Sequence, residues 1–288
     1  MLFAKTRHAQ GTGLTGLVHS LSSLALVVLG LTSTAQEPLK LEDGYRGIWY
    51  CNEPSNDEYR FKYSGGFATY PQQHIPIACY SRVANKTYFV FGGTTARSRD
   101  EKQQLLHMIS YFDHTTGMVP RPRILLNKQT SDAHDNPTLS IDDSGHLWIF
   151  SPSHGTGRPS YVHRSKAPFS IDEFEEVSKT NFSYSQPWYL PGQGFLLLHT
   201  RYGAGKPHGS DAIRCLFWMK STDGKNWTTP QMLAGISMGD YQVSWRKGDC
   251  IGTAFDYHPQ PKGLNGRSRS EEHTSELQSP CNLVCRLL

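Results

Sequence analysis

The apolar and polar positions of this chain alternate in short runs, and almost no stretch shows the spacing of an amphipathic helix. Four pairs of such runs are each interrupted by residues that favour tight turns. These four predicted β-hairpins span residues 75–93, 137–153, 187–201 and 241–258. Further predicted strand pairs lie at 107–122, 161–177 and 214–230. The pattern predicts an all-β chain.

The four hairpins form an internal repeat. Their turns recur roughly every 50 to 60 residues, and the intervening strand pairs bring each repeat to about four strands. A repeat of this length with four strands is typical of one blade of a β-propeller, whose ring closure removes the free sheet edges. The pattern therefore predicts a β-propeller, of which about four to five blades are present in this chain.

A loop at residues 221–227 carries a second signal about the fold. It resembles the Asp-box of sialidase-type blades, in which a turn aspartate binds backbone amides and a tryptophan packs between sheets. Asp223 and Trp227 take these places, although one residue is missing between Asp223 and Gly224. The loop favours a sialidase-like β-propeller. Because Asp-boxes are structural, it indicates fold and not activity.

The N-terminal segment does not belong to the predicted fold. Lys5 and Arg7 precede an apolar run at 21–31, and the small residues 33–35 follow it. This order predicts a signal peptide over residues 1–35 that is removed from a secreted or periplasmic protein. A membrane anchor is the alternative, but the apolar run is about half as long as a bilayer-spanning helix. We therefore expect no membrane span after signal cleavage.

The C-terminal segment, residues 268–288, does not continue the strand pattern. From Arg269 onward it matches the reading-frame translation of a common sequencing-adapter oligonucleotide. We therefore expect a non-native tail, with a genuine disordered tail as the alternative, and a partial β-propeller over residues 36–267. Cys281 and Cys285 fall in this tail, and the other cysteines match no compact disulfide framework.

Charge excludes one class of partner. The net charge is +4 at pH 7, and no cluster of lysine and arginine alternates with aromatic residues. We therefore expect no nucleic acid as a partner.

The repeat predicts which side chains meet at one face. In a propeller, residues before the first strand and after the second strand of each blade gather around the central axis. Each such residue can instead cap a strand end through a hydrogen bond, but their joint occurrence predicts a functional face. Before the first strands stand His74, His134, Tyr184 and Tyr241, and after the second strands stand Thr94, His154, Arg201 with Tyr202, and Tyr257 with His258.

The side chains of this face suit an anionic carbohydrate. Arg201 can pair with a carboxylate, and histidines exchange protons near neutral pH. Glycosidases need two acids that flank the bond, whereas Asp132, Asp135, Asp240 and Asp256 form no obvious pair. β-Elimination beside a carboxylate needs a neutraliser, a base and an acid. His134, His154, Tyr184 and Arg201 can supply these three functions, which favours a secreted lyase that acts on an acidic polysaccharide.

Two alternatives to the lyase stay open. One is a non-catalytic glycan-binding propeller, and the other is a sialidase-like glycoside hydrolase, which needs an arginine triad and a tyrosine–glutamate pair.

The predicted site has a catalytic group and a substrate-binding group. The catalytic group is His134, His154, Tyr184 and Arg201, and the substrate-binding group is Asn136, Arg158, Tyr202, Tyr241 and His258.

A family resemblance adds to this interpretation. The stretch 44–259, most clearly at 133–143 and 151–161, resembles the BNR-repeat family that contains the ulvan-lyase-type polysaccharide lyases. The resemblance implies a seven-bladed propeller when complete. It also implies cleavage of uronate-containing polysaccharides by β-elimination, with no cofactor required for the chemistry.

The resemblance also implies roles for single residues. The paired catalytic histidines of the family fall on His134 and His154, and the tyrosine and arginine fall on Tyr184 and Arg201, with Tyr202 as a competitor for the tyrosine. Relatives also carry a structural zinc ion, but the spacing here has no compact zinc signature. The candidate zinc ligands are His199, His208, Cys215, Cys250 and His258.

Overall fold

The computed structural model describes residues 37–42, 44–46, 74–97, 101–202, 214–234, 240–257 and 285–287. All of them belong to one compact unit, Gln36–Leu288. The predicted signal peptide at 1–35 lies outside the described residues. Within the described ranges, no helix is long and apolar enough to cross a bilayer.

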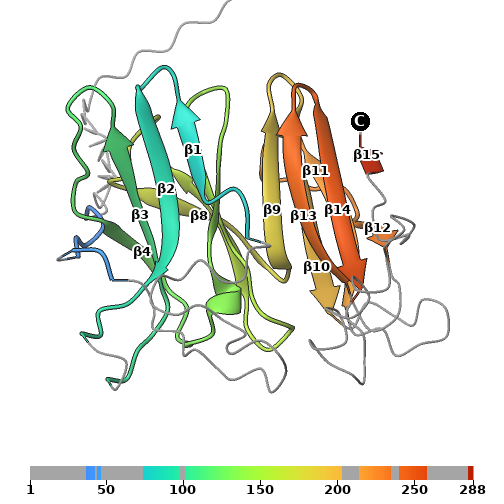
Figure 1. Cartoon of the computed structure of the whole chain (residues 1–288), viewed down its shortest axis with the longest axis horizontal. Coiled ribbons are helices and arrows are strands. Elements are labelled where there is room, and N and C mark those ends of the chain that lie inside the picture. Colours follow the sequence, from blue (N-terminus) through green and yellow to red (C-terminus); the bar gives the residue numbers. More distant parts are fainter. Residues whose placement is uncertain are drawn as a thin grey trace, which may run out of the picture. The chain divides into compact units, whose positions relative to one another are not determined.

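The described chain folds into four antiparallel sheets whose strands follow one another in chain order (Figure 1). The first sheet contains β1 (Ala78–Ser81), β2 (Lys86–Gly93), β3 (Leu106–Asp113) and β4 (Arg123–Asn127). The second contains β5 (Thr138–Ile141), β6 (Leu147–Ser151), β7 (Ser160–Ser165) and β8 (Phe174–Thr180). The third contains β9 (Ser183–Leu190), β10 (Gly194–Tyr202), β11 (Arg214–Ser221) and β12 (Gln231–Ala234).

The fourth sheet contains β13 (Asp240–Lys247), β14 (Cys250–Tyr257) and β15 (Cys285–Leu287). β15 lies in the segment that the sequence analysis expects to be a non-native tail, and it pairs with Ile251–Thr253 of β14. The origin of this segment stays a prediction. One short 3-10 helix, η1 (Ala133–Asp135), precedes β5.

The sheets pack face to face in chain order. Tyr88 and Val90 of the first sheet share a core with Leu139 and Ile149 of the second. The third sheet is covered on both sides, which explains why β10 is apolar at consecutive positions. Its residues Phe195 and Leu197 pack with Trp148 and Phe150 of the second sheet, whereas Leu196 and Leu198 pack with Ile251 of the fourth.

This arrangement confirms the predicted all-β class and is propeller-like. Each of the four predicted hairpins forms two neighbouring strands at the start of a sheet. The closed ring and the number of blades stay predictions, since the described residues provide four sheets.

The turn between β11 and β12 joins two sheets. The Asp223 carboxylate accepts the backbone N–H groups of Lys225 at 2.8 Å and Asn226 at 2.7 Å, and the Asn226 N–H in particular lowers the pKa of Asp223. The Trp227 ring lies 6.0 Å from that of Phe150 in the second sheet. The turn between β11 and β12 of the third sheet therefore packs against the second sheet.

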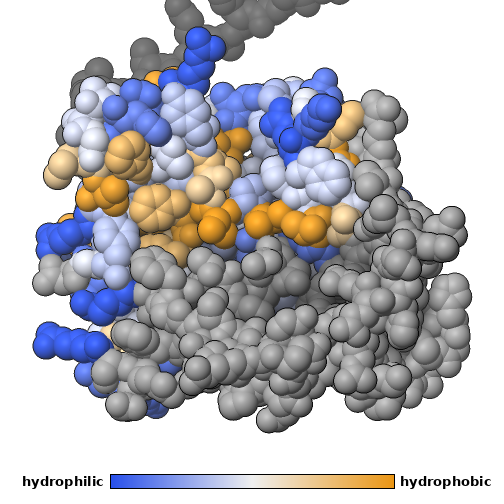
Figure 2. Space-filling model, viewed as in Figure 1, coloured by the Kyte–Doolittle hydropathy of each residue, from blue (hydrophilic) through white to orange (hydrophobic). Residues whose placement is uncertain are grey.

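One face of the fourth sheet is exposed. The Ser244 hydroxyl accepts the indole N–H of Trp188 at 2.7 Å, so it faces the third sheet. Side chains alternate along a strand, and the neighbours Val243 and Trp245 are 47% and 43% exposed. Figure 2 shows apolar residues gathered in a band across one face of the described part of the chain.

Candidate active site

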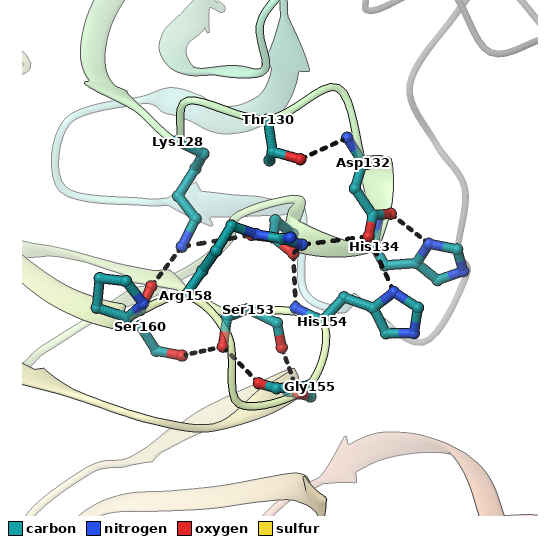
Figure 3. A network of polar contacts seen from close by, with 12 residues as sticks. Lys128, Thr130, Asp132, His134, Ser153, His154, Gly155, Arg158 and Ser160 are labelled. Carbon is teal, nitrogen blue, oxygen red and sulfur yellow. Dashed lines mark hydrogen bonds and ion pairs between the residues drawn. The ribbon is translucent and has the colours of Figure 1, made fainter.

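Two histidines from different parts of the second sheet lie side by side (Figure 3). His134 belongs to η1, and His154 follows β6. Their ring centroids are 4.2 Å apart, and their planes differ by 18°. The side chain of His134 is 14% exposed and that of His154 is 34% exposed. The predicted proximity of the two histidines is therefore present, whereas their catalytic roles stay predictions.

The carboxylate of Asp132 binds both rings. Its Oδ1 accepts Nδ1–H of His134 at 2.5 Å, and its Oδ2 accepts Nδ1–H of His154 at 2.9 Å. Burial alone would raise the pKa of Asp132, but the hydrogen bonds from His134 and His154 outweigh burial and lower it. Asp132 therefore stays ionised, and an ionised carboxylate only accepts hydrogen bonds. Both Nδ1 atoms are donors in this arrangement.

A second carboxylate, that of Asp135, anchors the loop that carries His154. Asp135 is fully buried, and its Oδ1 accepts the backbone N–H of His154 at 2.6 Å. Arg158 donates to both of its oxygens, at 2.8 Å and 2.9 Å, and also reaches Asp132 at 3.2 Å. These bonds to Asp135 raise the pKa of Arg158. Arg158 thus links the two carboxylates.

Lys128 completes the ion cluster beneath the histidines. Its ammonium lies 3.6 Å from Asp135 and donates to the carbonyl oxygen of Pro159 at 2.7 Å. Burial lowers the pKa of Lys128 to about 8, while Asp135 acts in the opposite direction. The negative charge of the buried Asp135 carboxylate is therefore balanced by two cations, Arg158 and Lys128.

Tyr184 reaches the histidines from the third sheet. Its ring centroid lies 6.1 Å from those of both His134 and His154, and its hydroxyl lies 3.5 Å from that of Tyr202. The Tyr202 ring is 5.7 Å from His154. Two histidines and two tyrosines thus surround one point, as the repeat alignment predicts.

A β-bulge aims Tyr184 at this point. Ser183 pairs with Thr200 and Gln186 with Leu198, so Tyr184 and Ser185 together oppose His199. Tyr184 has a φ of 50°, in the left-handed region that bulky residues rarely occupy. The hairpin pattern predicts Tyr184 just before the first strand, but the sequence has no signal for the bulge.

His74 lies against Tyr184, with ring centroids 5.5 Å apart. It is buried, and neither ring nitrogen has a hydrogen-bond partner. Burial, followed by the nearby His134, lowers the pKa of His74 to about 3. The His74 imidazole is therefore uncharged at ordinary pH and lines the site beside Tyr184.

The other predicted residues lie as follows. Arg201 is exposed near the end of β10, and its guanidinium lies 5.4 Å from the centroid of the Phe217 ring. Asn136 is buried at the end of η1, where its backbone N–H donates to Ala133. Tyr241 belongs to β13, but its side chain is outside the described part of the structure, as is all of His258.

The roles of Asp132 and Asp135 were not predicted from the sequence. Both acids were candidates only for a glycosidase pair, which they do not obviously form. The available signal was the tetrad 132–135, in which an acid stands on each side of Ala133 and His134. In the structure, one acid binds the rings and the other binds the backbone and Arg158.

Two sets of residues bear on metal binding. Asp132, His134 and His154 lie within 4.8 Å of one another and are the one group of three potential ligands among the described residues. A metal ion bound through the two Nδ1 atoms would have to displace both bonds to the carboxylate, whereas one bound through the Nε2 atoms would leave them in place.

The predicted zinc ligands fit only in part. His199 and Cys215 are buried on the neighbouring strands β10 and β11, and Nδ1 of His199 has no hydrogen-bond partner. Cys250, by contrast, follows the turn between β13 and β14. His208 and His258 lie outside the described residues. The structural zinc stays a prediction.

Comparison with solved structures shows the class of fold. The chain resembles a structure described as a new family of polysaccharide lyase, PL25 ulvan lyase, with a TM-score of 0.51 and 20% identity over 65% of this chain and 46% of that chain. The same lyase bound to -[GlcA(1-4)Rha3S]- also gives a TM-score of 0.51, at 19% identity and the same coverage. No family model matches the sequence.

Comparison with curated proteins identifies a particular relative. The chain is 29% identical over 168 residues to the ulvan lyase PL25 of Pseudoalteromonas sp. strain PLSV. The match covers 49% of this chain and 33% of that relative. The chain thus spans about a third of the length of the curated relative that it matches.

Proposed function

We propose that this protein is a polysaccharide lyase that cleaves a uronate-containing glycan by β-elimination. The observation that carries the proposal is the pair His134 and His154 on one carboxylate, with Tyr184 6.1 Å from both rings. The similarity to ulvan lyase PL25 supports the same reaction and substrate class. An acidic polysaccharide is the proposed partner.

The reaction needs three functions at the uronate residue. A cation or hydrogen-bond donor stabilises the carboxylate, a base removes the proton at C5, and an acid protonates the leaving oxygen at C4. The C4–C5 double bond forms as the C5–H and C4–O bonds break. The Tyr184 hydroxyl or one histidine serves as base, and Arg201 neutralises the carboxylate. No cofactor enters this scheme.

The test is an assay for the unsaturated product, which absorbs in the ultraviolet. We expect the chain to raise the absorbance on uronate polysaccharides, and His134→Ala and His154→Ala each to lower kcat by about 100-fold or more. His114→Ala is the matched control, because His114 is exposed and contacts Thr87 on the first sheet. Full activity of both site variants contradicts the assignment. Glycan binding without any absorbance change indicates a glycan-binding propeller instead.

We further propose that the fold is a closed, sialidase-like propeller with seven blades in the complete protein. The exposed apolar side chains of Val243 and Trp245 support this, since a following sheet would cover them. The backbone hydrogen bonds of Asp223 and the inward packing of Trp227 support an Asp-box at the turn between β11 and β12.

Secretion is also a proposal, and it rests on the order of basic, apolar and small residues in the first 35 positions. N-terminal sequencing of exported protein is expected to begin near Gln36. Protein retained in the cytoplasm with an intact N-terminus contradicts secretion.

A further inference from the structure

We propose that Asp132 is a positioning residue that fixes the tautomer and orientation of both His134 and His154. The inference rests on the proposed function, because it assigns a role within the same site. Each carboxylate oxygen accepts one Nδ1–H, at 2.5 Å from His134 and 2.9 Å from His154. In a neutral imidazole only one nitrogen carries a proton. Two Nδ1–H donors therefore leave both Nε2 atoms unprotonated in the neutral rings.

The two rings point the same way. Figure 3 shows both imidazoles extending from the Asp132 carboxylate toward the same side, with the second nitrogen of each ring directed away from it. The near-parallel planes, 18° apart, agree with this view. One carboxylate thus turns two proton acceptors toward one region, next to Tyr184 and Tyr202.

The carboxylate itself is held in place. The Asp132 backbone N–H donates to the Thr130 hydroxyl at 3.1 Å, and Oδ1 accepts the His134 backbone N–H at 3.0 Å. Arg158 also donates to Oδ2, at 3.2 Å. Catalytic histidines commonly depend on such a carboxylate to fix tautomer and ring orientation. Here a single carboxylate fixes two of them.

Asp132→Asn gives a sharp test, because an amide has the size of a carboxylate but lacks its charge and one of its two acceptor oxygens. Its oxygen accepts an Nδ1–H from one histidine, but its NH2 group can only donate. The histidine facing the NH2 group must then move its proton to Nε2. Side-chain 15N NMR spectra are expected to show two Nδ1–H histidines in the native site and one of each tautomer in the variant.

Kinetics provide the second measurement. We expect Asp132→Asn to lower kcat by about 10²- to 10⁴-fold, the range in which a misplaced histidine proton acts. KM should change less than about threefold, since Asp132 acts through the histidines. Asp132→Glu keeps two acceptor oxygens, so it should retain both Nδ1–H tautomers and lose less activity.

Asp142→Asn is the matched control. Asp142 lies in the β5–β6 turn, where its carboxylate is 3.8 Å from His146 and accepts the indole N–H of Trp148. It should leave the tautomers of His134 and His154 and the kcat unchanged. A thermal unfolding curve for each variant verifies that it is folded.

Three results would overturn the proposal. They are unchanged tautomers in folded Asp132→Asn, a loss confined to KM, or the same tautomer change in Asp132→Glu. The NMR measurement needs no substrate. If the native chain cleaves no uronate polysaccharide, the proposed function fails, and the nitrogen spectra still decide the role of Asp132.

Discussion

Tyr184 combines burial, an uncommon backbone conformation and a polar group at a single residue. It is 1% exposed, its φ is 50°, and its hydroxyl meets that of Tyr202. A bulky residue in the left-handed region costs on the order of 1–3 kcal/mol, and such strain gathers at functional sites. The bulge that holds it is therefore best explained by the position it gives the hydroxyl.

Removal of that hydroxyl gives the first prediction. Tyr184→Phe should keep the fold, because the ring and its packing on His74 remain, and lower kcat by about 10²- to 10⁴-fold. Tyr189→Phe is the control on the same strand, where the hydroxyl binds Asp143 instead. The ultraviolet lyase assay measures both. Equal activity of Tyr184→Phe and the native chain would transfer the role of Tyr184 to Tyr202 or a histidine.

The buried carboxylate of Asp135 gives the second prediction. Asp135→Asn leaves Arg158 and Lys128 with one compensating charge fewer, so the free energy of unfolding should fall by about 3–5 kcal/mol. Urea denaturation measures the change. Asp172→Asn breaks an ion pair with Arg123 in which Asp172 is 57% exposed, and should cost about 1 kcal/mol or less. Similar costs for both variants would show that Asp135 is not a buried anchor.

At this scale the sequence predicts part of the site. His134 and His154 were predictable, because they flank one hairpin and the strand repeat places them at the same end. The function of Asp132 was not, since it depends on two ring nitrogens that converge from different segments. The direction of the Tyr184 side chain depends on a β-bulge of one extra residue, which the alternation of apolar positions does not reveal.

At the scale of elements, the contact between neighbouring sheets depends on glycines in the turns. Gly224, in the turn between β11 and β12, has a φ of 71°, and a Cβ there would lie 2.4 Å from the ring of Trp148. Trp148 is 2% exposed in the second sheet, so its ring has little room to move. Gly192, in the β9–β10 turn, has a φ of 69° and open space around it.

This pair of glycines gives the third prediction. Gly192→Ala should cost about 1–2 kcal/mol of unfolding free energy through its backbone alone. Gly224→Ala carries the same backbone cost and displaces Trp148, so it should cost about 1–3 kcal/mol more. Urea denaturation of both variants measures the difference. Equal costs would mean that Trp148 does not pack against this turn.

The elements themselves were largely predictable. The inner hairpins have both an alternating pattern and turn residues, and all of them form paired strands. The helix η1 was not predicted, because three residues are too few for a periodic signal. Its position depends on the Asp132 side chain, which caps it by accepting the His134 N–H.

At the scale of the whole molecule, the cores hold several buried histidines. His163 and His199 each have an Nδ1 without a hydrogen-bond partner, and His107 binds Ser151 through Nδ1 at 2.8 Å. Burial lowers the pKa of His163 to about 4 and that of His199 to about 3. His107 is on the first sheet, His163 on the second and His199 on the third, and the nearby Lys128 ammonium also contributes to the lowered pKa of His163.

The last prediction is that acid destabilises the whole fold through these histidines. Below pH 6.5 the unfolded chain binds protons that the folded chain does not, so the free energy of unfolding falls with falling pH. The loss should extend from about pH 6.5 to about 4 for His163 and to about 3 for His199, at up to about 1.4 kcal/mol per pH unit and proton.

Urea denaturation between pH 8 and pH 5 measures this slope, and His163→Gln and His199→Gln should each reduce it because neither variant can take up the proton. Above pH 7, where both histidines are neutral in either state, the variant and native curves should run parallel. Any difference in unfolding free energy above pH 7 therefore reports the packing lost in the variant, whereas a difference in slope below pH 7 reports the lost proton uptake. A native slope unchanged in both variants would place the acid sensitivity in other groups, such as His74, whose pKa burial also lowers to about 3.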